Sequence, residues 1–187
     1  KILVSYSAFA VAAYQIGGRI DVVIFLPIMA IATALTTLVG MFYGAKDNNN
    51  VKLIIKYGML RSIYVTTIIS ALVYIAAPTV AKVFTNEPEI VSISVTYIRL
   101  IVIIYPLVSI GMTSGRVMQG LGLGLPMLVT TTIRVLGVSA PLALIFNFIY
   151  HKPIEWMWYS MMIATVIAVS TASIWLRSAL KKRSIIA

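Results

Sequence analysis

The sequence predicts an all-α fold, a polytopic bundle of transmembrane helices with five complete spans. Two observations carry this prediction. Of the 187 residues, 60% are hydrophobic and only 11% are charged, and the mean hydropathy is +1.00. Apolar stretches as long as the roughly 20 residues that cross a bilayer as a helix fill most of the chain. They run over residues 20–43, 53–77, 89–118, 127–150 and 154–176.

Residues 1–19 precede the first of these stretches. They are apolar over 2–16, which is short for a complete span, and they end in Gly17-Gly18-Arg19. We interpret them as the end of a truncated preceding helix and a turn near residues 5–7, followed by a long helix that begins near Ala8. The alternative is a single long first helix that is broken at the glycines.

Turn residues separate the first three spans. The span over 20–43 closes at Gly44-Ala45, and the polar cluster 46–50 follows it. The span over 53–77 is expected to end near Pro78, with the apolar residues up to Phe84 as an interfacial turn. The span over 89–118 follows a helix start with an Asn cap at Asn86 and a proline in the first turn.

The last two spans are bounded in the same way. The glycine-rich segment 119–124 ends the third span, and Pro126 opens the fourth, 127–150. Residues 151–153 form the turn into the fifth span, 154–176, and a basic tail follows over 177–187. Because all of the connections are short, we expect neighbouring helices to be antiparallel.

The charges predict how the protein lies in the membrane. The net charge is +10, and most of the basic residues flank the first connection, the third connection and the fifth span. These residues are Lys46, Lys52, Lys56, Arg61, Arg116, Arg177, Lys181, Lys182 and Arg183. Cytoplasmic loops collect Lys and Arg, so both connections and the C-terminal tail are expected on the cytoplasmic side. The membrane itself is expected to be the plasma or inner membrane of the cell. Cations at helix ends, rather than on one basic face, argue against a nucleic-acid partner.

Several classes of function find no support in the sequence. Cysteine is absent, and the one histidine, His151, has no second ligand at metal-binding spacing. No Ser-His-Asp set, P-loop or HExxH motif occurs. We therefore expect a protein that is not an enzyme, with no metal site and no cofactor.

Ionisable groups inside the spans indicate a pathway for an ion or a substrate. A charge within a bilayer is costly and usually faces the bundle interior or a water path. Asp21 lies in the first span, and Arg99 lies on the order of 16 Å past Pro88 in the third. We expect these two side chains to pair near the outer part of a cavity. The hydroxyls of Tyr14, Tyr97 and Tyr105 are further candidates to line it, although tyrosine also serves as an anchor at the membrane interface.

Other residues of the spans have simpler expected roles. Arg134 lies roughly 12 Å past Pro126, and the simplest interpretation is that it snorkels to the cytoplasmic headgroups. Trp156 and Trp158 are expected in the outer aromatic belt. Three prolines inside the spans are expected to kink their helices. They are Pro27, Pro106 and Pro141.

The order of these features resembles a known family of transporters. The segments that carry the resemblance are Val11-Ala12-Ala13-Tyr14, Gly18-Arg19-Ile20-Asp21, Phe25-Leu26-Pro27 and Val39-Gly40-Met41-Phe42-Tyr43-Gly44-Ala45-Lys46. Tyr97-Ile98-Arg99, Pro106, Gln119-Gly120-Leu121-Gly122, Pro126, Arg134 and Pro141-Leu142 continue it. Together they are similar to the C-terminal half of multidrug and toxic compound extrusion (MATE) transporters, over about residues 8–145. The chain departs from many relatives at Met41-Phe42, where those have Gln-Asn.

The resemblance implies that the chain corresponds to about helices 8–12 of a twelve-helix fold built from two halves, so that the N-terminal half would be a missing partner. Members of the family are secondary antiporters, which export organic, often cationic, compounds in exchange for protons or sodium. Two alternatives remain open at the level of sequence. One is a flippase of the same superfamily that moves lipid-linked oligosaccharides, and the other is a membrane anchor subunit that transports nothing.

Overall fold

The structure is a computed structural model that describes residues 7–150 and 153–186. Within these ranges the chain forms helices joined by short connections. The helices are α1 (Ala8–Gly44), α2 (Asn48–Phe84), α3 (Pro88–Gly120), α4 (Leu125–Thr132), the π-helix η2 (Ile133–Ser139), α5 (Ala140–Leu144), the π-helix η3 (Ile145–Ile149) and α6 (Glu155–Lys182). The elements from α4 to η3 follow one another without a break and form the fourth span. Five helical units are therefore long and apolar enough to cross a membrane, as the sequence predicts.

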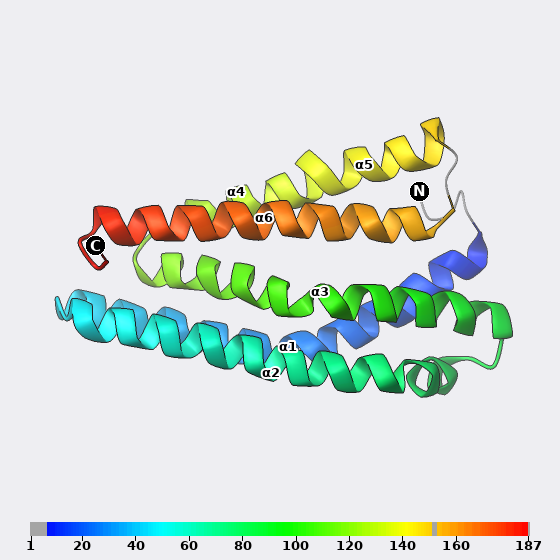
Figure 1. The fold of residues 1–187 in the computed structure, drawn as a ribbon, viewed down its shortest axis with the longest axis horizontal. Helices are drawn as coiled ribbons and strands as arrows, with labels where there is room; N and C mark the ends of the chain where they lie inside the picture. The colour runs from blue at the N-terminus through cyan, green and yellow to red at the C-terminus, as the bar shows by residue number, and fades with distance from the viewer. Residues whose placement is uncertain (1–6, 151–152, 187) are drawn as a thin grey trace.

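The spans lie side by side and alternate in direction (Figure 1). Helix α3 lies at the centre and packs against α1, α2 and α6, and α1 also packs against α2. The fourth span packs mainly against α6 and diverges from it towards η3 (Figure 1). In the described part of the chain α1 and the fourth span do not pack directly against each other, which leaves space between them.

The first helix begins earlier than the apolar stretch that starts at residue 20. Ser7 has an extended backbone and caps α1, since its hydroxyl oxygen accepts a hydrogen bond of 3.0 Å from the Ala10 N–H. The helix then continues without a break through Gly17 and Gly18, so the long first helix begins at Ala8 as expected, and the alternative of a break at the glycines is wrong. A glycine inside a helix costs only about 1 kcal/mol, and packing of α3 against Gly17 offsets that cost. The expected turn near residues 5–7 lies outside the described residues, apart from Ser7.

The second helix also passes the position where the sequence predicted its end. Helix α2 runs through Pro78 to Phe84, so the expected interfacial turn is helical. A proline removes one backbone hydrogen bond but does not end a helix that packing holds in place. Ala77 and Ala81, on either side of Pro78, are fully buried against the bundle and supply that packing.

The π-helical turns of the fourth span have a local cause. Pro141 has no N–H to donate to the carbonyl four residues earlier, and its ring would clash with that carbonyl in a regular α-helix. The turns before it widen, and the Ala140 N–H donates to the Val135 carbonyl, five residues back. The expected kink at Pro141 thus takes the form of a π-helix, η2, and such segments often mark functional sites in membrane and soluble proteins.

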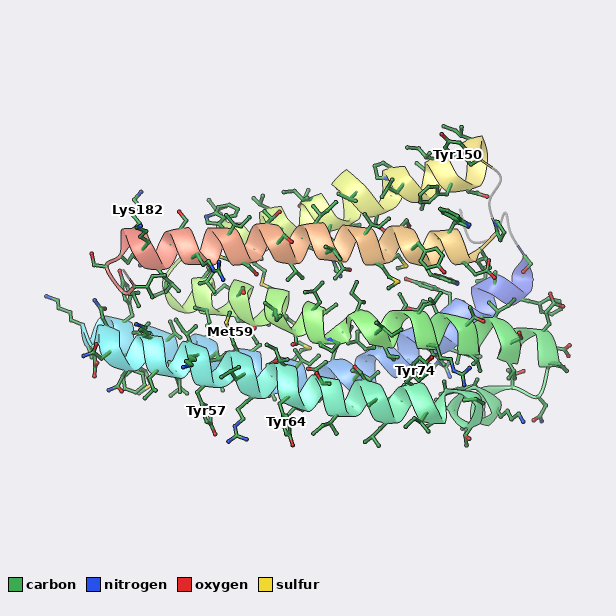
Figure 2. All side chains as sticks on the ribbon, in the orientation of Figure 1. Tyr57, Met59, Tyr64, Tyr74, Tyr150 and Lys182 are labelled. Carbon is green, nitrogen blue, oxygen red and sulfur yellow. The ribbon has the colours of Figure 1, made fainter. Side chains whose placement is uncertain are left out.

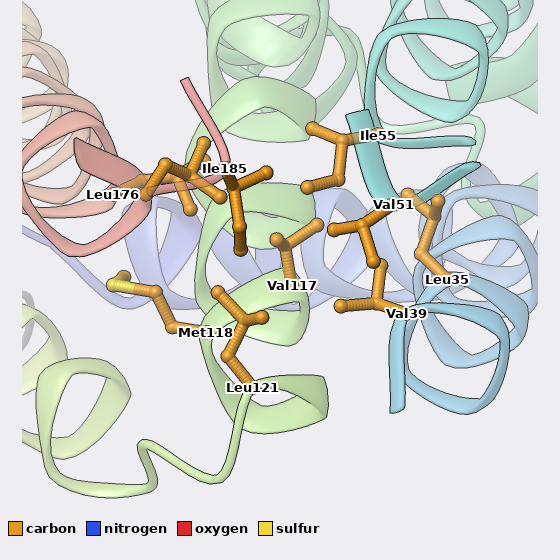
Figure 3. Packing of buried hydrophobic residues seen from close by; sticks show 10 residues of the cluster. Leu35, Val39, Val51, Ile55, Val117, Met118, Leu121, Leu176 and Ile185 are labelled. Carbon is orange, nitrogen blue, oxygen red and sulfur yellow. The ribbon is translucent and has the colours of Figure 1, made fainter. Parts of the chain in front are cut away.

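Two buried clusters hold the bundle together, one towards each end. The first joins α1, α2, α3, α6 and the tail through Leu35, Val39, Val51, Ile55, Val117, Met118, Leu121, Leu176, Leu180 and Ile185 (Figure 3). The second joins the other ends of the same helices through Ile20, Ile24, Ala77, Tyr97, Ile98, Ile101, Val102, Tyr105 and Trp158. Many large hydrophobic side chains of α2, including Tyr57 and Tyr64, instead point away from the bundle (Figure 2), as expected for a surface that faces lipid.

Candidate functional site

The carboxylate of Asp21 is held by two tyrosine hydroxyls from α3. Tyr97 donates a hydrogen bond of 3.0 Å to Oδ2, and Tyr105 donates one to Oδ1. Both tyrosines are buried, with 2% of their surface exposed, and Asp21 itself is partly buried. Asp21 is the only carboxylate in the interior of a span, because the other four acids lie in connections or within the first two residues of a helix.

A close approach of two helices places Tyr97 against this carboxylate. Its ring lies directly over Gly17 of α1, where an added Cβ would be only 2.0 Å from the Tyr97 Cε1. Gly17 and Asp21 are four residues apart, so they lie one above the other on the same face of α1. The absence of a side chain at Gly17 therefore lets the Tyr97 hydroxyl reach Asp21 one turn further on.

Aromatic rings surround the Asp21 cluster. Tyr14 stacks on Trp158 with centroids 5.9 Å apart, and it meets the edge of Tyr97 at 5.8 Å. Trp158 in turn contacts Tyr97 at 4.7 Å, while Phe25 packs edge-on against Tyr105 at 5.4 Å. These contacts tie α1, α3 and α6 together around the carboxylate and shield it from solvent.

The expected pair of Asp21 and Arg99 is not formed. Arg99 is exposed on the side of α3 that faces α2, and its guanidinium lies 5.4 Å from the centroid of the Tyr74 ring. Figure 2 shows Tyr74 on the α2 side of the bundle. Asp21 and Arg99 lie in the same half of the bundle, as their positions along the helices predict. The rotation of α3 about its axis, however, turns Tyr97 and Tyr105 towards Asp21 and turns Arg99 away from it.

The two tryptophans also differ from the expected aromatic belt. Trp158 is fully buried at the centre of the ring cluster, whereas Trp156 is 38% exposed and packs near Phe146 and Tyr159. Residues two apart on a helix point in nearly opposite directions, so only one of the pair can face lipid. The same geometry makes Trp158 a part of the site that sequence reasoning missed.

A cavity of about 250 Å³ lies next to this cluster, between α1, α3, the fourth span and α6. Phe25 forms one wall and joins the cavity to Tyr105 and Asp21. Arg134, in the π-helix η2, lines the same cavity from the fourth span and is half-buried. Tyr14 lies within electrostatic reach of both Asp21 and Arg134.

The remaining candidates are structural in this arrangement. Pro27 and Pro106 lie inside α1 and α3, close to the cavity wall, and Pro141 follows η2. Among the described residues no group of three His, Cys, Asp or Glu side chains is placed to hold a metal ion. The geometry therefore offers one buried acid with two hydroxyl donors, and beside it a cavity with one cation.

The model of the MatE family matches residues 2–145 of the chain. The chain belongs to the MatE family. The resemblance that the sequence motifs indicated is thereby confirmed, and so is the all-helical fold of MATE type.

Curated relatives support the same assignment. A probable multidrug resistance protein NorM from Thermotoga maritima is 26% identical over 171 residues, which are 91% of this chain and 37% of that protein. The chain thus spans well under half of the length of this MATE relative.

Solved MATE structures match the whole bundle. An outward-facing multidrug resistance MATE transporter is 25% identical with a TM-score of 0.87, and the match covers 97% of this chain and 41% of that one. An inward-facing one is 26% identical with a TM-score of 0.84, over 92% of this chain and 41% of that one. The five spans therefore have an arrangement that is similar to one lobe in both conformations.

Proposed function

We propose that the protein containing this chain is a secondary active exporter of organic compounds, driven by protons or sodium, and that Asp21 carries the coupling ion. The family and the multidrug resistance relatives support the class of transporter. Two observations support the role of Asp21. It is the one carboxylate in the interior of a span, and the hydroxyls of two buried tyrosines donate hydrogen bonds to it.

The chemistry of the site suits reversible binding of a cation. An ionised carboxylate in a membrane interior is costly, and the hydroxyls of Tyr97 and Tyr105 stabilise it by donating to both of its oxygens. A proton on Asp21 removes the charge and turns one acceptor into a donor. The protonated oxygen is a weaker acceptor than a carboxylate oxygen, so we propose that the tyrosine bond to it weakens or reverses its direction.

A change at Asp21 reaches both helices that hold it. Tyr97 packs on Gly17 and Tyr105 packs on Phe25, so α1 and α3 meet through the same residues that sense the ion. Pro27 lies six residues after Asp21 and weakens the backbone bonding of α1 at that point. We propose that loss of a tyrosine bond changes the contact of α1 with α3 and so biases the transporter between its two conformations.

Efflux from intact cells that express the complete protein tests this role. Ethidium and fluorescein serve as a cationic and an anionic fluorescent compound. Asp21→Asn is expected to lower export to less than about a tenth of wild type at equal expression, because the carboxylate can no longer exchange an ion. Tyr97→Phe and Tyr105→Phe should each lower it partially, and the double variant should not fall below Asp21→Asn.

The matched control is Arg99→Gln, which removes a cation that lies outside the cluster and should leave export unchanged. Wild-type export by Asp21→Asn would remove this residue from the mechanism. A deficit in Arg99→Gln as large as that in Asp21→Asn would contradict the separation of the two groups.

A further inference from the structure

The cavity beside Asp21 lacks the negative charge that a site for an organic cation needs. Carboxylates are absent from the residues that line it, and Arg134 is its single charged residue. Most of the other lining side chains are apolar, with three flexible methionines, Met29, Met112 and Met127. Methionine walls adapt to ligands of varied shape, so the cavity combines a soft apolar surface with one fixed positive charge.

No carboxylate of the described residues neutralises Arg134, and the residue within its electrostatic reach, Tyr14, is a phenol. The structure places no hydrogen bond or ion pair on its guanidinium within the described residues, although the side chain is half-buried. A guanidinium in such a place gains most from a planar anion that it can bind with two parallel hydrogen bonds. Asp21 does not supply that anion, because both of its oxygens accept bonds from Tyr97 and Tyr105.

Two of the three threonine hydroxyls on the cavity wall donate within their own helices, and the third, that of Thr131, is a neutral donor beside the charged Arg134. Thr130 donates to the Pro126 carbonyl at 2.8 Å, and Thr165 donates to the Met161 carbonyl at 2.8 Å. Both hydroxyl protons are therefore engaged within their own helices. The position of Arg134 is also not that of a regular helix, because the π-helix before Pro141 changes the rotation of the chain at this point.

We infer that this cavity binds an amphipathic organic acid, with its carboxylate on Arg134 and its apolar body between Phe25 and the methionines. The volume of about 250 Å³ is close to the lower end of small-molecule sites, which suits a bicyclic aromatic acid. Binding of the acid does not depend on the proposed export function. Only the statement that this acid is a transported substrate rests on that function. The sequence led us to expect a cationic compound, and the charge of this cavity favours the opposite sign.

Binding to the complete protein in detergent tests the inference without any transport step. The probes are 1-naphthylacetate and the neutral amide of the same size, 1-naphthylacetamide, measured by titration calorimetry. The wild type is expected to bind the acid at least about tenfold more tightly than the amide, as a charge-assisted bond predicts. Arg134→Gln should remove that preference and leave the affinity for the amide unchanged, whereas Arg134→Lys should retain part of it.

Two further variants keep the result decisive. Arg99→Gln removes a cation outside the cavity and should bind both probes as the wild type does. Met112→Trp fills the cavity and should weaken the acid and the amide alike, while Arg134 stays in place. Three results would each overturn the inference. They are equal affinity for acid and amide in the wild type, an unchanged preference for the acid in Arg134→Gln, and no binding of either probe because another helix or a lipid fills the cavity.

These outcomes are separate from those of the efflux experiment. A protein that binds the acid through Arg134 but exports neither test compound would overturn the proposed function and leave the site standing. A protein that exports through Asp21 but binds acid and amide equally would overturn only the inference about this cavity.

Discussion

At the scale of single residues, the candidate site depends on a glycine as much as on its ionisable groups. Asp21 and the three tyrosines Tyr14, Tyr97 and Tyr105 stood out in the sequence, since polar groups inside apolar spans are conspicuous. Gly17 did not, because a glycine next to a second glycine looks like a helix break. Its importance comes from the ring of Tyr97 on the neighbouring helix, which occupies the space where a Cβ would be.

Gly17→Ala therefore tests how tightly the site is built. The added methyl would lie 2.0 Å from the Tyr97 ring, so Tyr97 or α1 must move. We expect a loss of about 1–3 kcal/mol of stability, as for other overpacked cores, together with impaired export. Thermal unfolding of the purified complete protein measures the first effect, and ethidium or fluorescein efflux measures the second.

Gly18→Ala is the matched control for that substitution. An added Cβ at Gly18 has no neighbour within 4 Å, so nothing has to move. Replacing a glycine in a helix with alanine should be neutral or stabilise by up to about 1 kcal/mol. If Gly17→Ala is as stable and active as Gly18→Ala, the close contact with Tyr97 does not position Asp21.

At the scale of elements, the starts of the helices follow local chemistry, whereas their paths follow packing. Ser7 and Asp47 cap α1 and α2 with side-chain oxygens, in agreement with the general preference for such residues. Pro78 and Pro141, in contrast, lie within continuous helical segments. Tertiary contacts and a π-helical turn absorb the lost hydrogen bonds, and a proline alone does not reveal which of these outcomes occurs.

The cap of α2 has a predictable dependence on pH. Asp47 accepts hydrogen bonds from the backbone N–H and the side-chain amide of Asn50, and these bonds lower the pKa of its carboxyl below the ordinary value. A lowered pKa in the folded state means that the cap contributes its full stability above the ordinary pKa of aspartate and loses it as the pH falls through the lowered value. The protection of the amides over residues 48–51, measured as the ratio of intrinsic to observed exchange rate at each pH, should therefore fall in acid.

Substitutions at Asp47 separate the cap from its charge. Asp47→Ala should accelerate exchange over residues 48–51 at neutral pH, because no side chain accepts the Asn50 N–H. Asp47→Asn keeps an acceptor, so these amides should stay protected, and their protection should no longer fall in acid. Equal exchange in wild type and Asp47→Ala at neutral pH would show that the cap does not hold this end of α2.

At the scale of the whole molecule, the bundle is similar to one lobe of MATE transporters in outward-facing and inward-facing conformations alike. A lobe that keeps its arrangement in both states moves largely as a unit, which is a common form of alternating access in secondary transporters. In the proposed mechanism, the contact of α1 with α3 at Asp21 is where binding of an ion would change the position of such a lobe.

The distribution of charge predicts the topology of that lobe. Most of the 15 Lys and Arg residues lie at the ends expected in the cytoplasm, which include the connection over 45–47 and the tail. Asn49 and Glu87 are exposed at opposite ends of α2, and these 187 residues contain no cysteine that would interfere. In intact cells an impermeant thiol reagent should label Glu87→Cys, and it should label Asn49→Cys only after permeabilisation. The reverse pattern would invert the assigned orientation.

The sequence by itself determined the number of spans, their order and the class of the fold. These properties depend on the length of apolar runs and on turn residues between them, and both can be counted along one dimension. It also identified Asp21, because a lone carboxylate within a span is costly wherever the neighbouring helices lie.

Only the tertiary structure decided which groups meet at Asp21. Arg99 and Tyr97 are two residues apart at almost the same depth, and the rotation of α3 about its axis turns Tyr97 towards the acid and Arg99 towards Tyr74. That rotation is set by close contacts between helices, such as the ring of Tyr97 on Gly17. In the fourth span, the π-helix η2 in turn places Arg134 at the cavity. Such contacts join residues far apart in the chain, so no pattern within a single helix reveals them.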